Sequence, residues 1–163
     1  MGAGKSLVGP VLASQLNYTF IDLDSEVEAS YGQTVHEIFR TEGEAAFRKS
    51  EIAHTRRLLH RTCMVMALGG GALTDPEALK AVSDSAYLIY LQASPKTLYE
   101  RIRDENHRPL LEGLDEYADF LRMYNEKMIL RREGYECAQL TVSTDTAGVE
   151  DIVLEIMSAV DHE

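Results

Sequence analysis

Four short apolar runs alternate along the chain with longer segments whose apolar residues recur at helical spacing, and this alternation restricts the fold more than any other feature. The runs cover residues 19–23, 63–68, 86–91 and 139–142. The helical patterns cover about 5–16, 25–31, 35–40, 44–61, 76–83, 95–104, 116–132 and 147–160. Short apolar runs of this kind suit strands covered on both faces, so the pattern predicts an α/β fold, a parallel sheet with helices on both faces. A chain of 163 residues fits one such domain, residues 1–163.

The net charge of the chain argues against some classes of binding partner. The chain has 16 Lys and Arg against 27 Asp and Glu, a net charge of −11, which argues against nucleic acid, because proteins that bind it neutralise phosphates with clustered basic residues. A small anionic ligand in a local basic pocket is still compatible with this charge. No window approaches the roughly 20 consecutive apolar residues of a membrane span, and the first residues lack the apolar core of a signal peptide. We therefore expect a cytoplasmic protein that binds neither nucleic acid nor membrane.

The segment from Gly2 to Ser6 has the sequence Gly-Ala-Gly-Lys-Ser and opens the first helical pattern. It matches the end of the phosphate-loop motif G-x-x-x-x-G-K-[ST]. In that motif, backbone N–H groups surround phosphate oxygens, the lysine reaches the β- and γ-phosphates, and the hydroxyl ligates Mg²⁺. A flexible N-terminus is the alternative interpretation of this segment. The motif predicts nucleotide contacts from Gly2, Ala3, Gly4, Lys5, Ser6 and Leu7.

The first glycine of the motif, and the strand that precedes the loop in phosphate-loop folds, would lie before Met1. Two interpretations are open, a natural start upstream of Met1 or a shortened relative with impaired nucleotide binding, and we favour the first. For the 163-residue chain we expect four strands. We expect the strand ending at Asp22 and the strand ending near Leu68 to lack a paired neighbour where the missing strand belongs. We also expect this form to be poorly soluble, weakly stable and impaired in ATP binding.

Four further motifs follow in order. The run ending at Asp22-Leu23-Asp24 places two carboxylates on one side of a strand, at the edge where open α/β sheets bind ligands. The alternative is that Asp24 only caps a helix that starts near Ser25. The other three motifs are Gly-Glu-Ala-Ala-Phe-Arg at 43–48, Gly-Gly-Gly-Ala at 69–72 and Arg-Pro-Leu-Leu at 108–111. In order and spacing, this set resembles the shikimate kinases, from Gly2 to about Gly148.

The resemblance implies an ATP-dependent kinase that phosphorylates the 3-hydroxyl of shikimate with Mg²⁺, in the biosynthesis of chorismate and the aromatic amino acids. It also implies a monomer with the three-layer architecture of nucleoside monophosphate kinases, a substrate-binding region at about 24–61 and a lid at about 105–118. Under this resemblance, Lys5 holds the transferred phosphate, Ser6 ligates Mg²⁺, and Asp22 supports the metal through water. These roles suit phosphoryl transfer, which depends on positioning and charge neutralisation.

The resemblance assigns the remaining site residues as follows. Asp24 binds the attacking hydroxyl and assists its deprotonation, and Arg48 grips the substrate carboxylate, although Arg48 alone could be a surface charge on an amphipathic helix. Arg108 closes with the lid over the phosphoryl group. The close approach of backbone N–H groups to the substrate is assigned to Gly69, Gly70 and Gly71.

Two arginines are assigned with less support. Arg131 is the second carboxylate ligand, with Arg132 as the fallback, because residues 132–134 depart from the family's R-x-P-L-Y pattern before Tyr135. Arg101 matches a position near the adenine only loosely, and we favour a solvated helix face for it.

Two rival functions are considered. The first is another small-molecule phosphate-loop kinase, of the gluconate or nucleotide type, which the four motifs do not favour. The second is a non-catalytic module that keeps the shape of the family and binds a metabolite or partner without turnover.

Overall fold

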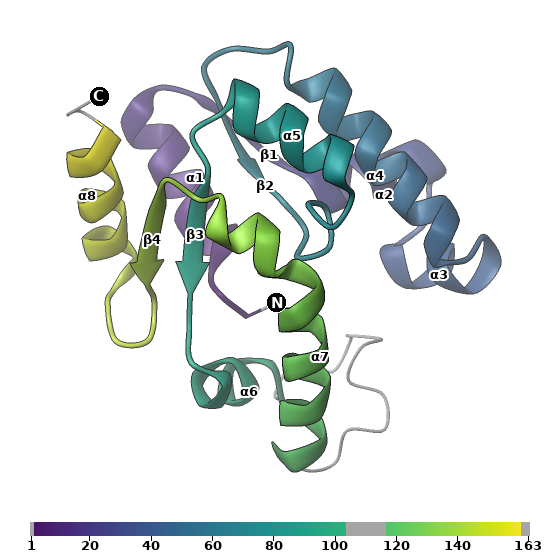
Figure 1. Ribbon diagram of the computed structural model, residues 1–163. Coiled ribbons are helices and arrows are strands. Elements are labelled where there is room, and N and C mark those ends of the chain that lie inside the picture. The colour runs from purple at the N-terminus through teal and green to yellow at the C-terminus, as the bar shows by residue number, and fades with distance from the viewer. Residues whose placement is uncertain (1, 104–116, 161–163) are drawn as a thin grey trace.

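The computed structural model describes residues 2–103 and 117–160, which form eight helices and four strands (Figure 1). In chain order these are α1 (Lys5–Leu16), β1 (Thr19–Asp22), α2 (Leu23–Tyr31), α3 (Val35–Thr41), α4 (Glu44–Leu58), β2 (Met64–Ala67), α5 (Pro76–Ser85), β3 (Ile89–Gln92), α6 (Pro95–Arg103), α7 (Tyr117–Glu136), β4 (Leu140–Ser143) and α8 (Val149–Val160). Each predicted apolar run overlaps one strand, so the predicted alternation of strands and helices is confirmed.

The strands form two separate parallel pairs. β1 pairs with β2, with Thr19 opposite Met64 and Asp22 opposite Ala67. β3 pairs with β4, with Ile89 opposite Leu140. Our expectation that the strands ending at Asp22 and near Leu68 both lack a neighbour at the same place is therefore wrong, because these two strands pair with each other. Among the described residues, β2 and β3 do not pair with each other. Each of them therefore has one edge without a strand partner, and these edges face the middle of the fold.

Helices cover both faces of the strands. α1 packs against β1, β2 and α8, and α8 also packs against β4. Figure 1 shows α5 and α7 on the opposite side of the strands from α1. α2, α3 and α4 pack against one another beside β1. Among the described helices, none is both long enough and apolar enough to cross a lipid bilayer.

Within residues 2–103 and 117–160, the buried apolar side chains form four clusters. The largest joins α1, β4 and α8 through side chains such as Leu12, Val142 and Ile156. A second surrounds Ile21 and Leu58, on the β1–β2 side. Helix α1 links the two strand pairs, because it packs against β1 and β2 and also belongs to the cluster with β4 and α8.

Asp22 determines how β1 turns into α2. Its Oδ1 accepts a hydrogen bond from the Asp24 amide at 3.0 Å and a longer one from the Ser25 amide at 3.5 Å, so Asp22 is the N-cap of α2. The alternative in which Asp24 caps this helix is therefore wrong. Since α2 begins at Leu23, Asp24 lies in its first turn with a side chain that the cap does not use.

Candidate active site

The phosphate-loop segment is held by backbone conformation. Gly4 is the N-cap of α1 with φ 91° and ψ 12°, a left-handed conformation that favours glycine, and its carbonyl accepts the amides of Leu7 and Val8. No side chain caps this helix start. The first-turn N–H groups of α1 therefore present the partial positive charge that suits an anion. Ser6 and Leu7 are exposed beside this turn.

Arg101 from α6 ties this segment to the loop after β4. Its guanidinium donates to the Gly2 carbonyl at 3.2 Å, to Thr144 Oγ1 at 3.1 Å and to the Thr144 carbonyl. Thr144 is buried, and a Cβ atom on Gly2 would lie 2.9 Å from Ile102 Cγ2, so the segment is packed against α6. Arg101 is exposed, as expected for a solvated helix face, but its guanidinium also connects two loops of the site.

Asp24 lies where the carboxyl ends of β1 and β2 meet. Its Oδ1 would be 3.0 Å from a Cβ atom placed on Gly69, so the carboxylate faces the turn that follows β2. Burial raises the pKa of Asp24 above its ordinary value of 3.8, the charge of Asp22 adds to the increase, and Lys5 and Arg48 oppose it. A half-buried carboxylate between a lysine and an arginine can accept a proton from a bound hydroxyl.

Arg48 from α4 projects into the same region. Its Nη1 donates to Glu51 Oε2 at 2.6 Å, and its Nη2 donates to Glu44 Oε1 at 3.1 Å. Its guanidinium carbon also lies 5.2 Å from the centre of the Phe47 ring. The side chain is 30% exposed. The interpretation of Arg48 as a simple surface charge is therefore wrong, since its guanidinium is held in place and half-buried.

Glu51 is a site residue that the sequence analysis missed. It is 1% exposed, and its Oε1 has no hydrogen-bond partner among the described residues. Burial raises the pKa of Glu51 above 4.5, although its pairing with Arg48 opposes the increase. The signal was present, because Arg48 and Glu51 are three residues apart and share one face of a helix. A buried carboxylate with one free oxygen points to a polar group that binds beside it.

The three glycines after β2 leave room for the charged side chains of the site. A Cβ atom on Gly69 would lie 2.7 Å from Glu51 Oε1, one on Gly71 would lie 2.7 Å from Arg48 Cζ, and one on Gly70 would collide with Arg131 Nη1. In all three cases the added Cβ atom would be closer than an ordinary van der Waals contact. Residues 70–73 form a turn, as the simpler interpretation of this segment predicts. A side chain at any of the three glycines would displace the charged end of Glu51, Arg131 or Arg48 from its position.

The structure distinguishes the two candidate arginines of α7. Arg131 projects from α7 onto Gly70, within reach of the charges of Glu51. Arg132 points outward, with a side chain 75% exposed and an ion pair to Glu136 at 2.7 Å. The geometry therefore places Arg131 in the site and leaves Arg132 on the surface.

The residues of the site fall into two groups. The acceptor side consists of Asp24, Arg48, Glu51, Gly69, Gly70, Gly71 and Arg131. The nucleotide side consists of Gly2, Ala3, Gly4, Lys5, Ser6, Arg101 and Thr144. Lys5 lies between them, because its charge acts on Asp24. The predicted site residue Arg108 and all but the last two residues of the predicted lid at 105–118 lie outside the described residues.

The sequence matches known proteins over almost its whole length. The profile of the shikimate kinase family matches residues 1–161. The shikimate kinase of Chlorobium chlorochromatii is 37% identical over 165 aligned residues, which cover 99% of this chain and 87% of the relative. That of Chlorobium phaeovibrioides is 38% identical, with 99% and 84% covered.

Solved structures agree with these matches. The shikimate kinase of Bacteroides thetaiotaomicron superimposes with a TM-score of 0.89 at 28% identity, covering 99% of this chain and 94% of that one. The shikimate kinase of Acinetobacter baumannii, solved in complex with shikimate, superimposes with a TM-score of 0.88 at 32% identity, covering 98% and 88%. With the family profile and the relatives above 30% identity, these findings show that the chain belongs to the shikimate kinase family, whose members are ATP-dependent kinases.

Proposed function

We propose that this chain transfers the γ-phosphoryl group of ATP to the 3-hydroxyl of shikimate. One observation carries the proposal: two arginines and two carboxylates from α2, α4 and α7 converge on three consecutive glycines beside the phosphate-loop segment. This arrangement offers cations for a carboxylate, acceptors for hydroxyl groups and a helix start for phosphates. A hydroxylated carboxylic acid such as shikimate matches that set of groups.

The acceptor side would bind the carboxylate of shikimate through Arg48 and Arg131. A guanidinium presents two parallel donors to a planar carboxylate, which gives orientation as well as attraction. Glu51 holds Arg48 through one oxygen and leaves the other for a hydroxyl group. Glu44 also pairs with Arg48, and its side chain is 66% exposed, so the carboxylate of the substrate can take its place. We therefore propose the region 24–61 as the main part of the substrate site, with the turn at 69–71 opposite it.

Asp24 would accept the proton of the attacking hydroxyl. Its raised pKa brings the carboxylate closer to the proton affinity that general base catalysis requires, and Lys5 and Arg48 keep it ionised. Lys5 would then contact the transferred phosphoryl group between Asp24 and the start of α1. Little covalent help is needed in phosphoryl transfer, so the alignment of these groups is the main contribution of the protein.

Mg²⁺ fits the donors at the nucleotide side. Among the described residues, no group of three or more His, Cys, Asp or Glu side chains lies together as a protein-only metal site. Mg²⁺ commonly uses one or two protein ligands together with waters and substrate phosphates. Ser6 would supply such a ligand, and Asp22 would support the ion through water with the oxygen that does not cap α2. The ion would supply charge neutralisation for the phosphates.

Several expectations from the sequence stay predictions. These are the neutralising role of Arg108, closure of the lid at 105–118, a monomeric state and a cytoplasmic location. The sequence motivates each of them, and each can be tested apart from the transfer reaction itself.

The proposal is tested by coupled measurement of ADP release with ATP, Mg²⁺ and shikimate. The protein is first shown to be folded by circular dichroism. We expect shikimate-dependent turnover, with gluconate and nucleoside monophosphates as poor acceptors. Absence of shikimate-dependent turnover in folded protein that binds ATP would contradict the proposal, and equal turnover of gluconate or a nucleotide would favour the rival kinases.

A further inference from the structure

Asp145 lies in the turn after β4 and bonds to the start of α6, 51 residues away in the sequence. Its Oδ1 accepts the Ser94 amide at 2.8 Å. Hydrogen bonds from the Thr97 hydroxyl and the Ser94 amide lower the pKa of Asp145 below its ordinary value of 3.8, so the carboxylate is ionised at neutral pH. Asp145 is exposed and belongs to neither side of the site. The contact therefore joins the end of β4 to the start of α6.

The start of α6 has a cap of its own. Ser94 Oγ accepts the Thr97 amide at 3.2 Å, which is the contact of an N-cap serine, and the Ser94 carbonyl accepts the Leu98 amide at 2.9 Å. Pro95, the first residue of α6, has no N–H group that needs an acceptor. Asp145 instead accepts the amide of the cap residue itself, which precedes the helix. The main effect of Asp145 is therefore on where α6 lies, because the helix already has its own start.

The same turn also holds the other end of α6. Thr144, the residue before Asp145, donates its amide to the Gln92 carbonyl at 2.7 Å and so continues the pairing of β4 with β3. The hydroxyl and the carbonyl of Thr144 accept hydrogen bonds from Arg101, near the end of α6. In Figure 1, this turn and α6 lie at the same, lower end of the molecule. Two consecutive residues of one turn therefore hold α6 near both of its ends.

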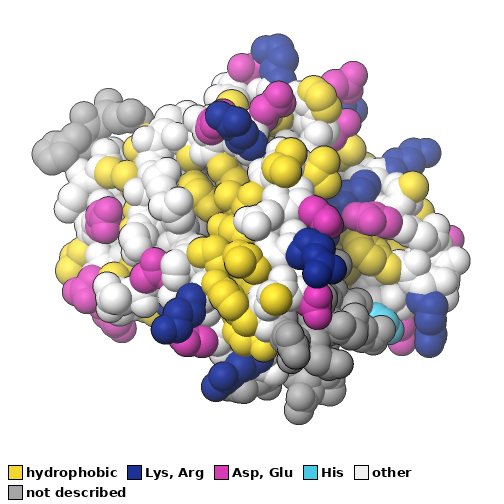
Figure 2. All heavy atoms as spheres, turned by 60° about the horizontal axis from the view of Figure 1, so that its bottom comes forward, with side chains coloured by type: hydrophobic (Ala, Val, Ile, Leu, Met, Phe, Trp, Pro, Cys, Tyr) yellow, Lys and Arg dark blue, Asp and Glu magenta, His cyan; other side chains and the backbone are white. Residues whose placement is uncertain are grey.

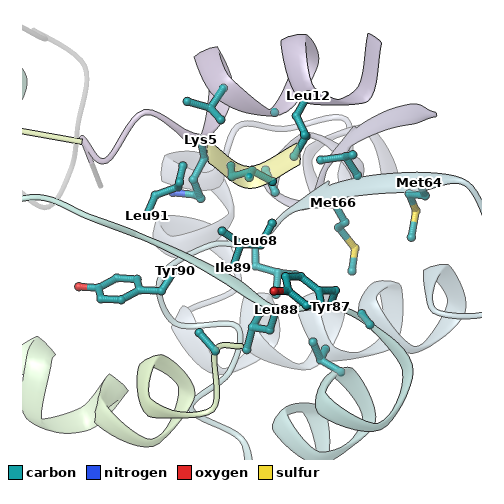
Figure 3. Close-up of a pocket in the computed structure, with 18 of the residues that line it drawn as sticks. Lys5, Leu12, Met64, Met66, Leu68, Tyr87, Leu88, Ile89, Tyr90 and Leu91 are labelled. Atoms are coloured by element: carbon teal, nitrogen blue, oxygen red, sulfur yellow. The ribbon is translucent and has the colours of Figure 1, made fainter. Parts of the chain in front are cut away.

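Helix α6 in turn supports the phosphate-loop segment. A Cβ atom on Gly2 would lie 2.9 Å from Ile102 Cγ2, so the backbone of Gly2 rests on α6. Arg101 donates to the Gly2 carbonyl at 3.2 Å. Figure 3 shows Lys5, further along this segment, and Leu91 of β3 at the same end of the cavity that both line. A shift of α6 would therefore move Gly2 and the residues that follow it.

We propose that Asp145 is a positioning residue for nucleotide binding. By holding the start of α6 to the turn after β4, it keeps the segment from Gly2 to Ser6 in the conformation that receives phosphates. The inference rests on the proposed function, which places the phosphates of ATP at the start of α1. Asp145 acts through α6 and touches no substrate. Because Arg101 holds the same helix directly beside Gly2, loss of Asp145 should weaken ATP binding less than loss of Arg101.

The sign of the effect separates positioning from simple electrostatics. Figure 2 brings the lower end of Figure 1 forward and shows Asp and Glu side chains at several places on this face. In a chain of net charge −11, removal of one exposed carboxylate reduces the repulsion of an anion. On charge alone, loss of Asp145 should therefore make ATP bind slightly more tightly. A positioning role predicts the opposite, because the phosphate-loop segment loses its support.

The test compares three variants by calorimetric titration with ATP and Mg²⁺ in the absence of shikimate. Asp145→Ala should weaken ATP binding by about 3–10-fold, since exposed hydrogen bonds to a charged group are lost. Asp145→Asn keeps an oxygen that can accept the Ser94 amide and should stay within about twofold of the parent. Glu155→Ala, at an exposed position of α8, removes the same charge and should bind ATP at least as tightly as the parent. Shikimate affinity should stay within about twofold in all three variants.

Amide hydrogen exchange without any ligand tests the same contacts independently of the proposed function. In Asp145→Ala, the Leu7 and Val8 amides, which donate to the Gly4 carbonyl, should exchange faster than in the parent. The Thr19 amide is the internal control, because it donates to the Cys63 carbonyl at the amino end of β1. Its exchange rate should be the same in both proteins.

Several outcomes would overturn the proposal. ATP binding by Asp145→Ala that equals or exceeds that of Glu155→Ala would show that only charge matters, and unchanged exchange at Leu7 and Val8 would show that the segment does not depend on Asp145. Equal weakening of ATP and shikimate would indicate a general loss of structure. If the parent binds ATP but transfers no phosphoryl group to shikimate, the proposed function fails and this inference stands, because neither readout needs transfer. Absence of ATP binding by the parent would overturn both.

Discussion

The two sides of the site are built in different ways. On the acceptor side, charged side chains pack directly on one another and on glycines, with Glu51 buried under Arg48 and Arg131 against Gly70. On the nucleotide side, backbone conformation at Gly4 and hydrogen bonds from Arg101 hold the segment. Single side chains should therefore control shikimate binding and chemistry, whereas nucleotide binding depends on how a backbone segment is held.

The largest expected effect is that of Asp24→Asn. Loss of the proton acceptor should lower kcat by about 10²–10⁴-fold, and the dissociation constants of ATP and shikimate should change by less than about threefold. Helix α2 should be unaffected, because Asp22 is its N-cap. Steady-state kinetics and calorimetric titration check both parts. Turnover equal to that of the parent would remove Asp24 from the reaction.

Arg101→Ala tests the nucleotide side. The change removes hydrogen bonds from a charged group to Gly2 and Thr144, so ATP affinity should fall by about 10–100-fold while shikimate affinity stays within about threefold. The matched control is Lys96→Ala on the same helix, because Lys96 is 79% exposed and makes only a 4.0 Å ion pair with Glu100. An equal loss of affinity for both ligands would show that the two sides are not independent.

The pH dependence of kcat should report Asp24. The carboxyl must be ionised to accept a proton, and burial raises its pKa above 3.8. Turnover should therefore fall on the acid side with an apparent pKa above 3.8, losing about tenfold for each pH unit well below that pKa. The residual activity of Asp24→Asn should lack this limb. A profile that stays flat down to pH 4 contradicts the assignment.

The smallest effect is expected for Arg57→Ala. Arg57 lies on the same helix as Arg48, but its ion pair with Glu26 is exposed, with 59% of the arginine side chain accessible. Exposed pairs of this kind contribute about 0–1 kcal/mol. Thermal unfolding and shikimate affinity should both stay close to the parent. A large loss of shikimate affinity would show that the charge of α4 as a whole, rather than the position of Arg48, matters.

Much of the fold could be predicted because its signals are local. The start of β1 at Thr19 and the Pro76 start of α5 follow from an apolar run and from an Asp-Pro pair at a helix start. The prediction placed the third strand from residue 86, but pairing begins at Ile89, since the Gln139 side chain accepts the Leu88 amide. That contact joins residues far apart in the sequence, which no local pattern indicates. The pairing of β1 with β2 was missed for the same reason.

The site residues also divide into those that the sequence predicted and those that it did not. Asp24, Arg48 and the three glycines were predicted as one site, and the structure brings them together. Glu51 was missed although its spacing from Arg48 was visible, because a buried unpaired oxygen shows only in three dimensions. The hydrogen bonds of the exposed Arg101 were missed because its partner Thr144 is 43 residues away. Residues whose role depends on distant contacts were the ones that sequence patterns did not identify.

The central claim is that Arg48 holds the carboxylate of shikimate. A thermodynamic cycle that changes both the protein and the ligand tests it most directly. Shikimate and its methyl ester, which lacks the negative charge, are titrated by calorimetry into the parent and into Arg48→Ala, each shown to be folded. A charge-assisted pair of this kind corresponds to about 2–5 kcal/mol, so esterification should weaken binding to the parent by at least about 30-fold. In Arg48→Ala the same esterification should cost less than about threefold, because the partner is already absent. An equal loss in both proteins would show that Arg48 does not contact the carboxylate, and the account of the acceptor side would be wrong.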